Sequence, residues 1–382
     1  MTQPQIMFVN SQSILDPRIV DFWQDYPQHD WVNYHKISQR WTTSHHQNYL
    51  REGTNVLPFR NEVVDLLDIA PPKYDTNFNK TFADVTDQRY FELHEKYGDS
   101  EWLVLWSGGI DSTLILALLR KKFPDIDVET ISIKFAQSLD ESEKAAKTSE
   151  FFGVKHQTIQ LENYLKELPQ AIFAVGLPFW DLHWYYVVKK ARAITKHLAS
   201  GDGGDELFGG YTFRYSKFLS LVTESSTPLD KVKAYLACHE RDNVSDQQDV
   251  FGPKAEFSWD KIYQFLLPYF DNKLDPLNQV FLADYNGKLL YNFSIVNTKI
   301  HNHFEINNVS PILSQKLIQY STRLASDQKY DHNNDLGKLP LRQLLKKFGT
   351  DHFISAEKHG FSVNTVFSSA TLSGLGAISL SP

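Results

Sequence analysis

Two acidic, glycine-rich stretches hold the residues best suited to chemistry in this sequence. The first, SGGIDS, covers residues 107–112, and the second, SGDGGDELFGGY, covers residues 200–211. Glycines between a strand and a helix let backbone N–H groups approach an anion closely, and the helix N-terminus adds the positive end of its dipole. We therefore expect the first stretch to bind phosphate. Its residue order is neither G-x-x-x-x-G-K-S/T nor G-x-G-x-x-G, which disfavours those two nucleotide-binding classes.

The acidic residues in both stretches indicate a cation. Asp111 would repel a bound phosphate unless a magnesium ion lay between carboxylate and phosphate. In the second stretch Asp202, Asp205 and Glu206 crowd together, which is costly without a cation. We predict a nucleoside triphosphate over the first stretch, with Mg²⁺ held between Asp111 and Asp205. The structural alternatives are a plain tight turn and an acidic turn that solvent alone satisfies.

The elements around these stretches predict an α/β fold with a doubly wound parallel sheet, because strand-like and helix-like segments alternate. The expected strands are 103–106, 128–135, 155–161 and a short one near 198–200. The expected helices between them are 112–123, 141–152 and 182–197. Ligands of such sheets bind beyond the carboxyl ends of the strands, so both stretches should border one crevice.

Helical patterns dominate after about residue 225, at 228–240, 259–270, 276–300, 311–326 and 338–348. This change divides the sequence into four predicted parts. They are an N-terminal extension (1–95), an α/β domain (96–225), a helical lobe that completes the site (226–370) and a flexible tail (371–382).

Composition and charge exclude several classes of protein. Hydrophobic residues make up 42% of the chain and the formal net charge is −7, which disfavours a general nucleic-acid binder. The single cysteine, Cys238, excludes an intramolecular disulfide and a cysteine metal cage, and we expect it to be a buried thiol. The first residues lack a secretory pattern and no apolar stretch is long enough to span a membrane. We expect a cytoplasmic protein without membrane or nucleic-acid partners.

The two motifs resemble those of a known enzyme group. SGGIDS is similar to the pyrophosphate-binding loop of the N-type ATP pyrophosphatases, the PP-loop superfamily. SGDGGDELFGGY resembles the second signature of the asparagine synthetase family, in its C-terminal synthetase domain. The resemblance covers about residues 95–370 and implies a five-stranded parallel sheet of the adenine nucleotide alpha hydrolase-like fold. It implies ATP and Mg²⁺ as cofactors.

The resemblance also implies a set of ligand-binding residues around the nucleotide. The pyrophosphate loop would consist of Ser107, Gly108, Gly109, Asp111 and Ser112. Asp111 and Asp205 would be the Mg²⁺ ligands and, through the metal, catalytic residues. The adenosine pocket would be lined by Trp106 and Ile133, on neighbouring strand ends. The residues near ribose, adenylate or the acid substrate would be Gly201 and Asp202.

A third, weaker match lies near the C-terminus. AEKHGFSVN, residues 356–364, resembles the late family segment whose lysine binds pyrophosphate and stabilises the adenylating transition state. Lys358 is therefore the predicted catalytic cation, with a surface lysine as the alternative. GKLPLRQLLKKF, residues 337–348, resembles the helix that precedes this segment.

The family chemistry is an ATP-dependent amide synthesis. A small-molecule carboxylate attacks the α-phosphate of ATP, giving an acyl-adenylate and pyrophosphate, and ammonia or an amine then displaces AMP. Developing phosphate charge makes metal and amide donors the main contributors to catalysis.

The sequence departs from glutamine-dependent relatives in two places. Those relatives expose a cysteine nucleophile after Met1, whereas position 2 is Thr2 and the preceding segment is too short for a glutaminase domain. We therefore expect nitrogen from free ammonia, another amine or a separate glutaminase subunit. HFEINNVSPILS, residues 303–314, lacks the arginine and final aspartate of relatives, which weakens aspartate as the substrate. We interpret His301, His303 and Glu305 as polar loop residues rather than a metal cluster.

Three other functions stay open beside asparagine formation. The first is a specialised amide, lactam or natural-product synthetase acting on a different acid. The second is a tRNA-modifying PP-loop enzyme, against which the acidic net charge argues. The third is a non-catalytic nucleotide-binding subunit that pairs with a glutaminase.

Overall fold

The computed structural model describes residues 80–98, 101–135, 142–161, 182–238, 259–285 and 297–354, with the isolated positions 167, 170, 171 and 174. Predictions for Thr2, Lys358 and the C-terminal tail lie outside these residues.

The predicted five-stranded parallel sheet is confirmed. Its strands are β1 (Trp102–Leu105), β2 (Val128–Phe135), β3 (Lys155–Leu161), β4 (His197–Ala199) and β5 (Asn307–Val309). All neighbours pair in parallel, in the order β3-β2-β1-β4-β5. Every residue of β1 is buried, as expected of a continuous apolar strand covered on both faces. The fifth strand comes from the C-terminal half of the chain, inside the segment predicted as a helical lobe.

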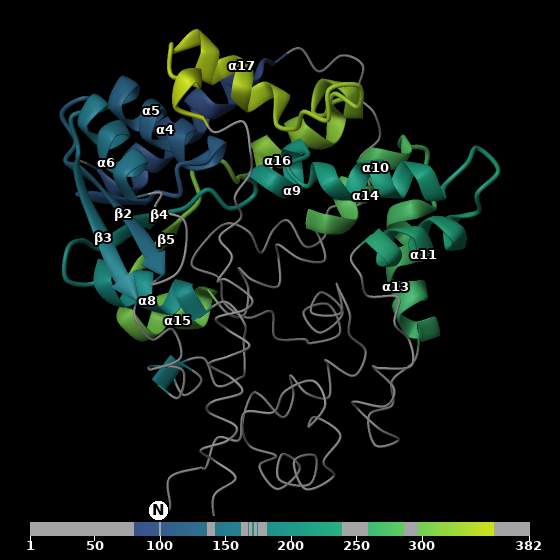
Figure 1. Cartoon of the computed structure of the whole chain (residues 1–382), viewed down its shortest axis with the longest axis horizontal. Coiled ribbons are helices and arrows are strands. Elements are labelled where there is room, and N and C mark those ends of the chain that lie inside the picture. The colour runs from purple at the N-terminus through teal and green to yellow at the C-terminus, as the bar shows by residue number, and fades with distance from the viewer. Residues whose placement is uncertain are drawn as a thin grey trace, which may run out of the picture.

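Helices cover the sheet on both faces. After β1 the chain moves outward through α5 (Ile110–Lys122) and α6 (Ser142–Phe151), and it returns to the other side of β1 after α8 (Leu182–Ala191). Right-handed crossovers then place α8 on the face opposite α5 and α6. In Figure 1, α8 lies with α15 (Thr298–Phe304) below the strands and away from α5. The doubly wound arrangement is therefore as predicted.

The helix predicted over 182–197 is too long. The helix ends at Ala191, and His197 already pairs with Trp102 in the sheet. Strand pairing with β1 overrides the local helical pattern at these positions, since burial in the sheet outweighs weak intrinsic propensity.

Residues just before the sheet belong to the main hydrophobic core. Helix α4 (Phe82–Tyr97) begins with a capping box in which Thr81 and Asp84 exchange hydrogen bonds. Phe82 and Tyr90 are buried in the core that also holds β1 and α5. The C-terminal part of the predicted extension is thus a structural layer of the α/β body.

A second core lies in the helical lobe, on the right of Figure 1. It is built by α10 (Thr212–Leu221), α11 (Pro228–Cys238), α13 (Trp259–Phe270) and α14 (Pro276–Asp284). The buried carboxylate of Asp284 joins three of these helices, accepting from the Tyr235 hydroxyl at 2.9 Å and lying 3.9 Å from Arg214. Cys238 is buried here, as predicted.

The remaining described helices return to the α/β body. They are α9 (Gly204–Phe208), α16 (Gln315–Arg323), α17 (Leu339–Lys347) and the 3-10 turns Ser326–Gln328 and Asp351–Phe353. Helix α17 packs on α5 and α4, which brings this late segment of the chain against helices that precede and follow β1. Across the described ranges, no helix combines the length and apolar character needed to cross a bilayer.

Lys329 is a buried lysine between the two cores, and it gives a first stability prediction. Its side chain donates to the Ser321 carbonyl oxygen at 2.9 Å and lies 4.6 Å from the centre of the Phe281 ring. Burial lowers the pKa of Lys329 to about 7, although the charge of Asp275 opposes this shift. The unfolded chain keeps the proton up to an ordinary lysine pKa of 10.5, so the stability conferred by this group rises with pH from about 7 to 10.5.

Lys329→Met should therefore raise the free energy of unfolding by roughly 2–4 kcal/mol at pH 7, with the gain disappearing toward pH 10. Chemical denaturation across this pH range measures the difference. Lys217→Met is the matched control, because Lys217 also donates to a main-chain carbonyl oxygen but is exposed. Equal pH slopes for wild type and Lys329→Met would contradict the prediction.

Candidate active site

The first glycine-rich stretch forms an open helix N-terminus after β1. Gly108 has a φ of +70°, a conformation that favours glycine, and Gly109 caps α5 without a side-chain hydrogen bond. The Ser107 and Ser112 hydroxyls lie 3.2 Å apart, and the Gly109 N–H donates to Ser107 Oγ at 3.3 Å. Ser107 itself is exposed. The loop therefore presents hydroxyls and the positive end of a helix to a bound anion.

Hydroxyl groups satisfy two of the three acids in the second stretch. Ser200 donates to Asp202 at 2.5 Å, and the buried Tyr211 donates to Glu206 at 2.5 Å. Crowding of carboxylates here is thus relieved partly by neutral hydroxyl donors. Asp205 forms an ion pair with Lys338.

The two stretches meet at the carboxyl edge of the sheet, because β1 and β4 are neighbours. A Cβ atom placed on Gly201 would lie 2.7 Å from Asp111 Cβ, and one on Gly204 would lie 2.1 Å from Asp111 Oδ1. Real Cβ atoms do not approach this closely, so both positions require glycine for the loops to touch. The expectation that the two stretches lie together is confirmed.

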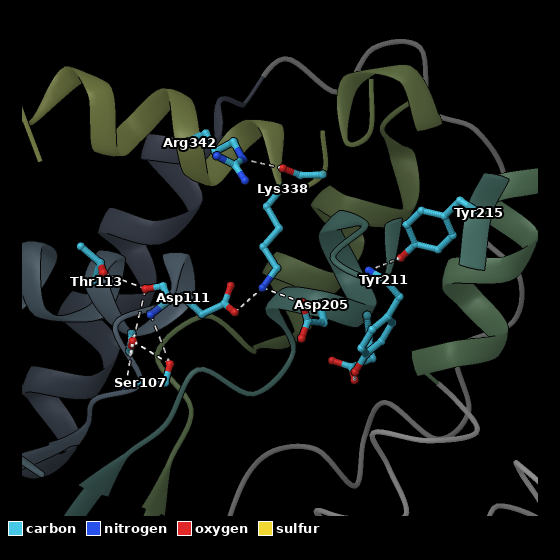
Figure 2. A network of polar contacts seen from close by, with 12 residues as sticks. Ser107, Asp111, Thr113, Asp205, Tyr211, Tyr215, Lys338 and Arg342 are labelled. Atoms are coloured by element: carbon cyan, nitrogen blue, oxygen red, sulfur yellow. Dashed lines mark hydrogen bonds and ion pairs between the residues drawn. The ribbon is translucent and has the colours of Figure 1, made fainter. Parts of the chain in front are cut away.

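The cation between the two loops is the ammonium group of Lys338. Figure 2 shows its side chain running from the start of α17 to a point between Asp111 on α5 and Asp205 on α9. Nζ contacts Asp111 Oδ2 and lies 2.6 Å from Asp205 Oδ1. Burial alone would lower the pKa of Lys338, but the charges of Asp111 and Asp205 outweigh it and raise that pKa, so the group stays protonated.

The backbone around Lys338 holds this side chain in place. Its N–H donates to the Phe208 carbonyl oxygen at 2.9 Å and its φ is +60°. A Cβ on Gly210 would lie 1.8 Å from Asp205 Oδ1 and 2.5 Å from Lys338 Cε. Arg342, one turn along α17, donates from Nε to the Gly337 carbonyl oxygen at 2.8 Å. Burial lowers the pKa of Arg342, and the negative charge of Asp111 opposes that shift. Lys338 therefore contacts both aspartates, and Arg342 adds a second positive charge near Asp111.

The sequence predicted Mg²⁺ between Asp111 and Asp205 and gave no role to Lys338, which contacts both carboxylates. A local signal was available: Lys338 directly precedes a helix, where the positive end of the helix dipole disfavours a cation. A lysine at such a position indicates an anionic partner elsewhere in the fold.

The predicted adenosine-pocket residues differ in exposure. Leu105 pairs with Ile131, so the half-buried Ile133 lies level with Ser107 at the edge of the sheet. Trp106 is fully buried in the core that also holds β1 and α5. Ligand-binding roles for Ile133 and Trp106 stay predictions, as do those for Gly201 and Asp202.

The histidines near residue 300 lie on a helix rather than in the predicted loop. His301 and His303 belong to α15, and the His301 ring is buried with Nδ1 3.1 Å from the Ile306 carbonyl oxygen. Among the residues that the structure describes, no cluster of three or more His, Cys, Asp or Glu side chains is arranged to hold a metal ion.

Asp111 and Asp205 suit a magnesium ion that arrives with phosphate. Mg²⁺ in proteins keeps several waters and takes one or two carboxylates together with substrate phosphate oxygens. Two carboxylates that converge on one charged nitrogen offer such a donor pair. Because the pair lies beside the open end of α5, a bound triphosphate could supply the remaining oxygens.

Comparisons with known proteins agree with the motif resemblance. A glutamine-hydrolysing asparagine synthetase of Bacillus subtilis (strain 168) is 35% identical over 121 residues, which cover 30% of this chain and 19% of that protein. A protein of Mycobacterium tuberculosis (strain ATCC 25618 / H37Rv), provisionally given the same name, is 33% identical over 120 residues, which cover 30% of this chain and 18% of that protein. The matched regions thus span about a fifth of the length of these curated relatives.

Similarity to solved structures is low. A U34-tRNA thiolase from Methanococcus maripaludis aligns with 52% of this chain and 84% of its own at 14% identity, with a TM-score of 0.26. The sequence model of the asparagine synthase family, in contrast, matches residues 97–375. That match covers both glycine-rich stretches and most of the chain, and this chain therefore belongs to the asparagine synthase family.

Proposed function

We propose that this protein is an ATP-dependent ligase that adenylates a small-molecule carboxylate and transfers the acyl group to ammonia or an amine. The observation that carries the proposal is the opposition of Asp111 and Asp205 across one buried cation, beside the open N-terminus of α5, in a chain of this family. Acidic groups and a phosphate-binding helix end suit chemistry on a metal-bound triphosphate.

The first loop would bind the pyrophosphate part of ATP. Ser107 and Ser112 would donate hydrogen bonds from their hydroxyls. Gly108 and Gly109 have no side chains, so their main chain could come close to the phosphate oxygens. Asp111 and Asp205 would hold Mg²⁺, which when bound offsets phosphate charge and orients the triphosphate. Lys338, and Lys358 by its resemblance, would offset the charge that grows on departing pyrophosphate.

The reaction proposed at this site has two steps. A carboxylate oxygen forms a bond to the α-phosphorus of ATP while the bond to the pyrophosphate oxygen breaks. The nitrogen of ammonia or an amine then attacks the acyl carbon, AMP leaves with the bonding electron pair, and the nitrogen loses a proton. The chain's part is to hold and orient the triphosphate and to stabilise charge on the leaving groups.

A pyrophosphate-release screen tests this function. The full chain is incubated with ATP, Mg²⁺ and a panel of amino acids and other carboxylates, with and without ammonia, and products are identified by mass spectrometry. We expect AMP and pyrophosphate in amounts that depend strictly on one class of carboxylate, followed by an amide. Formation of ADP and phosphate instead would overturn the proposal.

One observation favours an acid other than aspartate as the substrate. Segment 303–314, in which relatives carry an arginine, contains no arginine or lysine and supplies β5. Leu313 from this segment lies beside Gly203 in the second loop. A second carboxylate on the substrate would therefore lack a cation from this segment, which favours a specialised amide or lactam synthetase. Aspartate belongs in the screen as the reference acid.

The source of nitrogen is also part of the proposal. Free ammonia, an amine within the substrate or a separate glutaminase subunit would each supply the nucleophile. Varying ammonia at fixed carboxylate distinguishes an amine within the substrate from the other two sources, because an intramolecular amine makes product formation independent of added ammonia.

A further inference from the structure

Lys338 occupies the place where a metal ion would contact both aspartates. Its Nζ touches Asp111 Oδ2 and lies 2.6 Å from Asp205 Oδ1, so one ammonium group bridges the two loops (Figure 2). Asp111 belongs to the loop after β1 and Asp205 to the loop after β4. The lysine thus stabilises two carboxylates that would otherwise repel each other at close range.

This position of the lysine is built into the fold. Lys338 is 5% exposed and holds a left-handed backbone conformation, with its N–H bonded to Phe208. Gly210 leaves the room that its Cε needs, since a Cβ there would lie 2.5 Å from that atom. A lysine merely lying on the surface would have neither the burial nor the fixed main chain.

A divalent cation and the Lys338 ammonium compete for the same two carboxylates. Metal alone would leave a buried lysine without its anionic partners, which is costly. A metal that enters with a triphosphate brings negative oxygens that can pair with the displaced lysine. The two cations therefore exchange at low cost only when phosphate is present.

We propose that Lys338 is a placeholder cation, which bridges Asp111 and Asp205 until the triphosphate binds, so that a divalent cation binds there only together with the triphosphate. This inference rests on the proposed function, because it takes Asp111 and Asp205 as the metal ligands. It adds a role for Lys338 before any reaction, namely to hold the two loops together and to exclude free metal.

Manganese binding tests the inference without measuring activity. Mn²⁺ is titrated into the full-length protein and followed by electron paramagnetic resonance, with and without α,β-methylene-ATP. Wild type should bind Mn²⁺ tightly only with the nucleotide analogue. Lys338→Met should bind Mn²⁺ without nucleotide at least about tenfold more tightly than wild type, because a nearby unit charge no longer repels the metal.

Matched variants separate this effect from a general loss of buried charge. Lys329→Met removes another buried lysine and should bind Mn²⁺ as wild type does, since Lys329 contacts a carbonyl oxygen and an aromatic ring. Adding Asp205→Asn to Lys338→Met should abolish the gained affinity. Lys338→Gln keeps a polar chain and replaces the methionine variant if that protein does not fold.

The Mn²⁺ affinities test the placeholder role of Lys338 separately from the proposed metal site. Nucleotide-free Mn²⁺ affinity that is equal in wild type and the Lys338 variants would overturn the placeholder role and leave the metal site standing. Failure of every variant to bind Mn²⁺, even with the analogue, would overturn both the metal assignment and the inference.

Discussion

Asp111→Asn should reduce carboxylate-dependent pyrophosphate release by at least about a thousandfold while the protein remains folded. The amide has nearly the shape of the carboxylate but carries no charge, so it is a much weaker ligand for a divalent cation. Lys338 keeps its contact with Asp205 in the variant, so the buried lysine retains one anionic partner. Initial rates of pyrophosphate release under saturating ATP measure the loss, and circular dichroism checks the fold.

Asp87→Asn is the control for this substitution. Asp87 forms a partly exposed ion pair with Lys122 at 2.5 Å, on the α4 side of the body. Such pairs contribute about 1 kcal/mol or less, so the control should keep the wild-type rate within about twofold. Adding Asp205→Asn to Asp111→Asn should cost little further activity, because groups that hold one ion act as a unit. An Asp111→Asn protein with a tenth or more of wild-type activity would contradict the assignment.

Gly210→Ala should remove activity by at least about a hundredfold and lower the free energy of unfolding by roughly 2–3 kcal/mol. The added Cβ would lie 1.8 Å from Asp205 Oδ1 and 2.5 Å from Lys338 Cε, so both side chains must move. Movement of either breaks the bridge between the two loops. Thermal denaturation and pyrophosphate release measure the two effects on the same preparation.

Gly349→Ala is the control, because it replaces a glycine without creating a steric clash. Gly349 has a φ of +70°, and no atom lies within 4 Å of the place that a Cβ would take, so alanine there causes backbone strain alone. We expect it to cost about 1 kcal/mol of stability and no activity. Should Gly210→Ala retain activity as Gly349→Ala does, the close contact at Gly210 has no functional role.

Much of the α/β body follows from local sequence patterns. The apolar run of β1 and the glycine-rich turn before α5 have signatures within a few residues, because burial and turn geometry act locally. Local sequence patterns predicted the wrong secondary structure where pairing between distant segments of the chain decides it. His197 leaves the predicted helix to pair with Trp102, and β5 is a three-residue strand between two predicted helices of the part expected to be a helical lobe.

By itself the sequence determined the parallel sheet and the two glycine-rich loops, and it predicted Mg²⁺ between Asp111 and Asp205. Only the tertiary structure showed that the ammonium group of Lys338, which lies 227 positions from Asp111 along the chain, contacts both carboxylates. A contact between side chains so distant along the chain produces no hydrophobic periodicity or local motif from which it could be predicted. It depends on the packing of α17 against α5 and on glycines that let backbone and side chains approach.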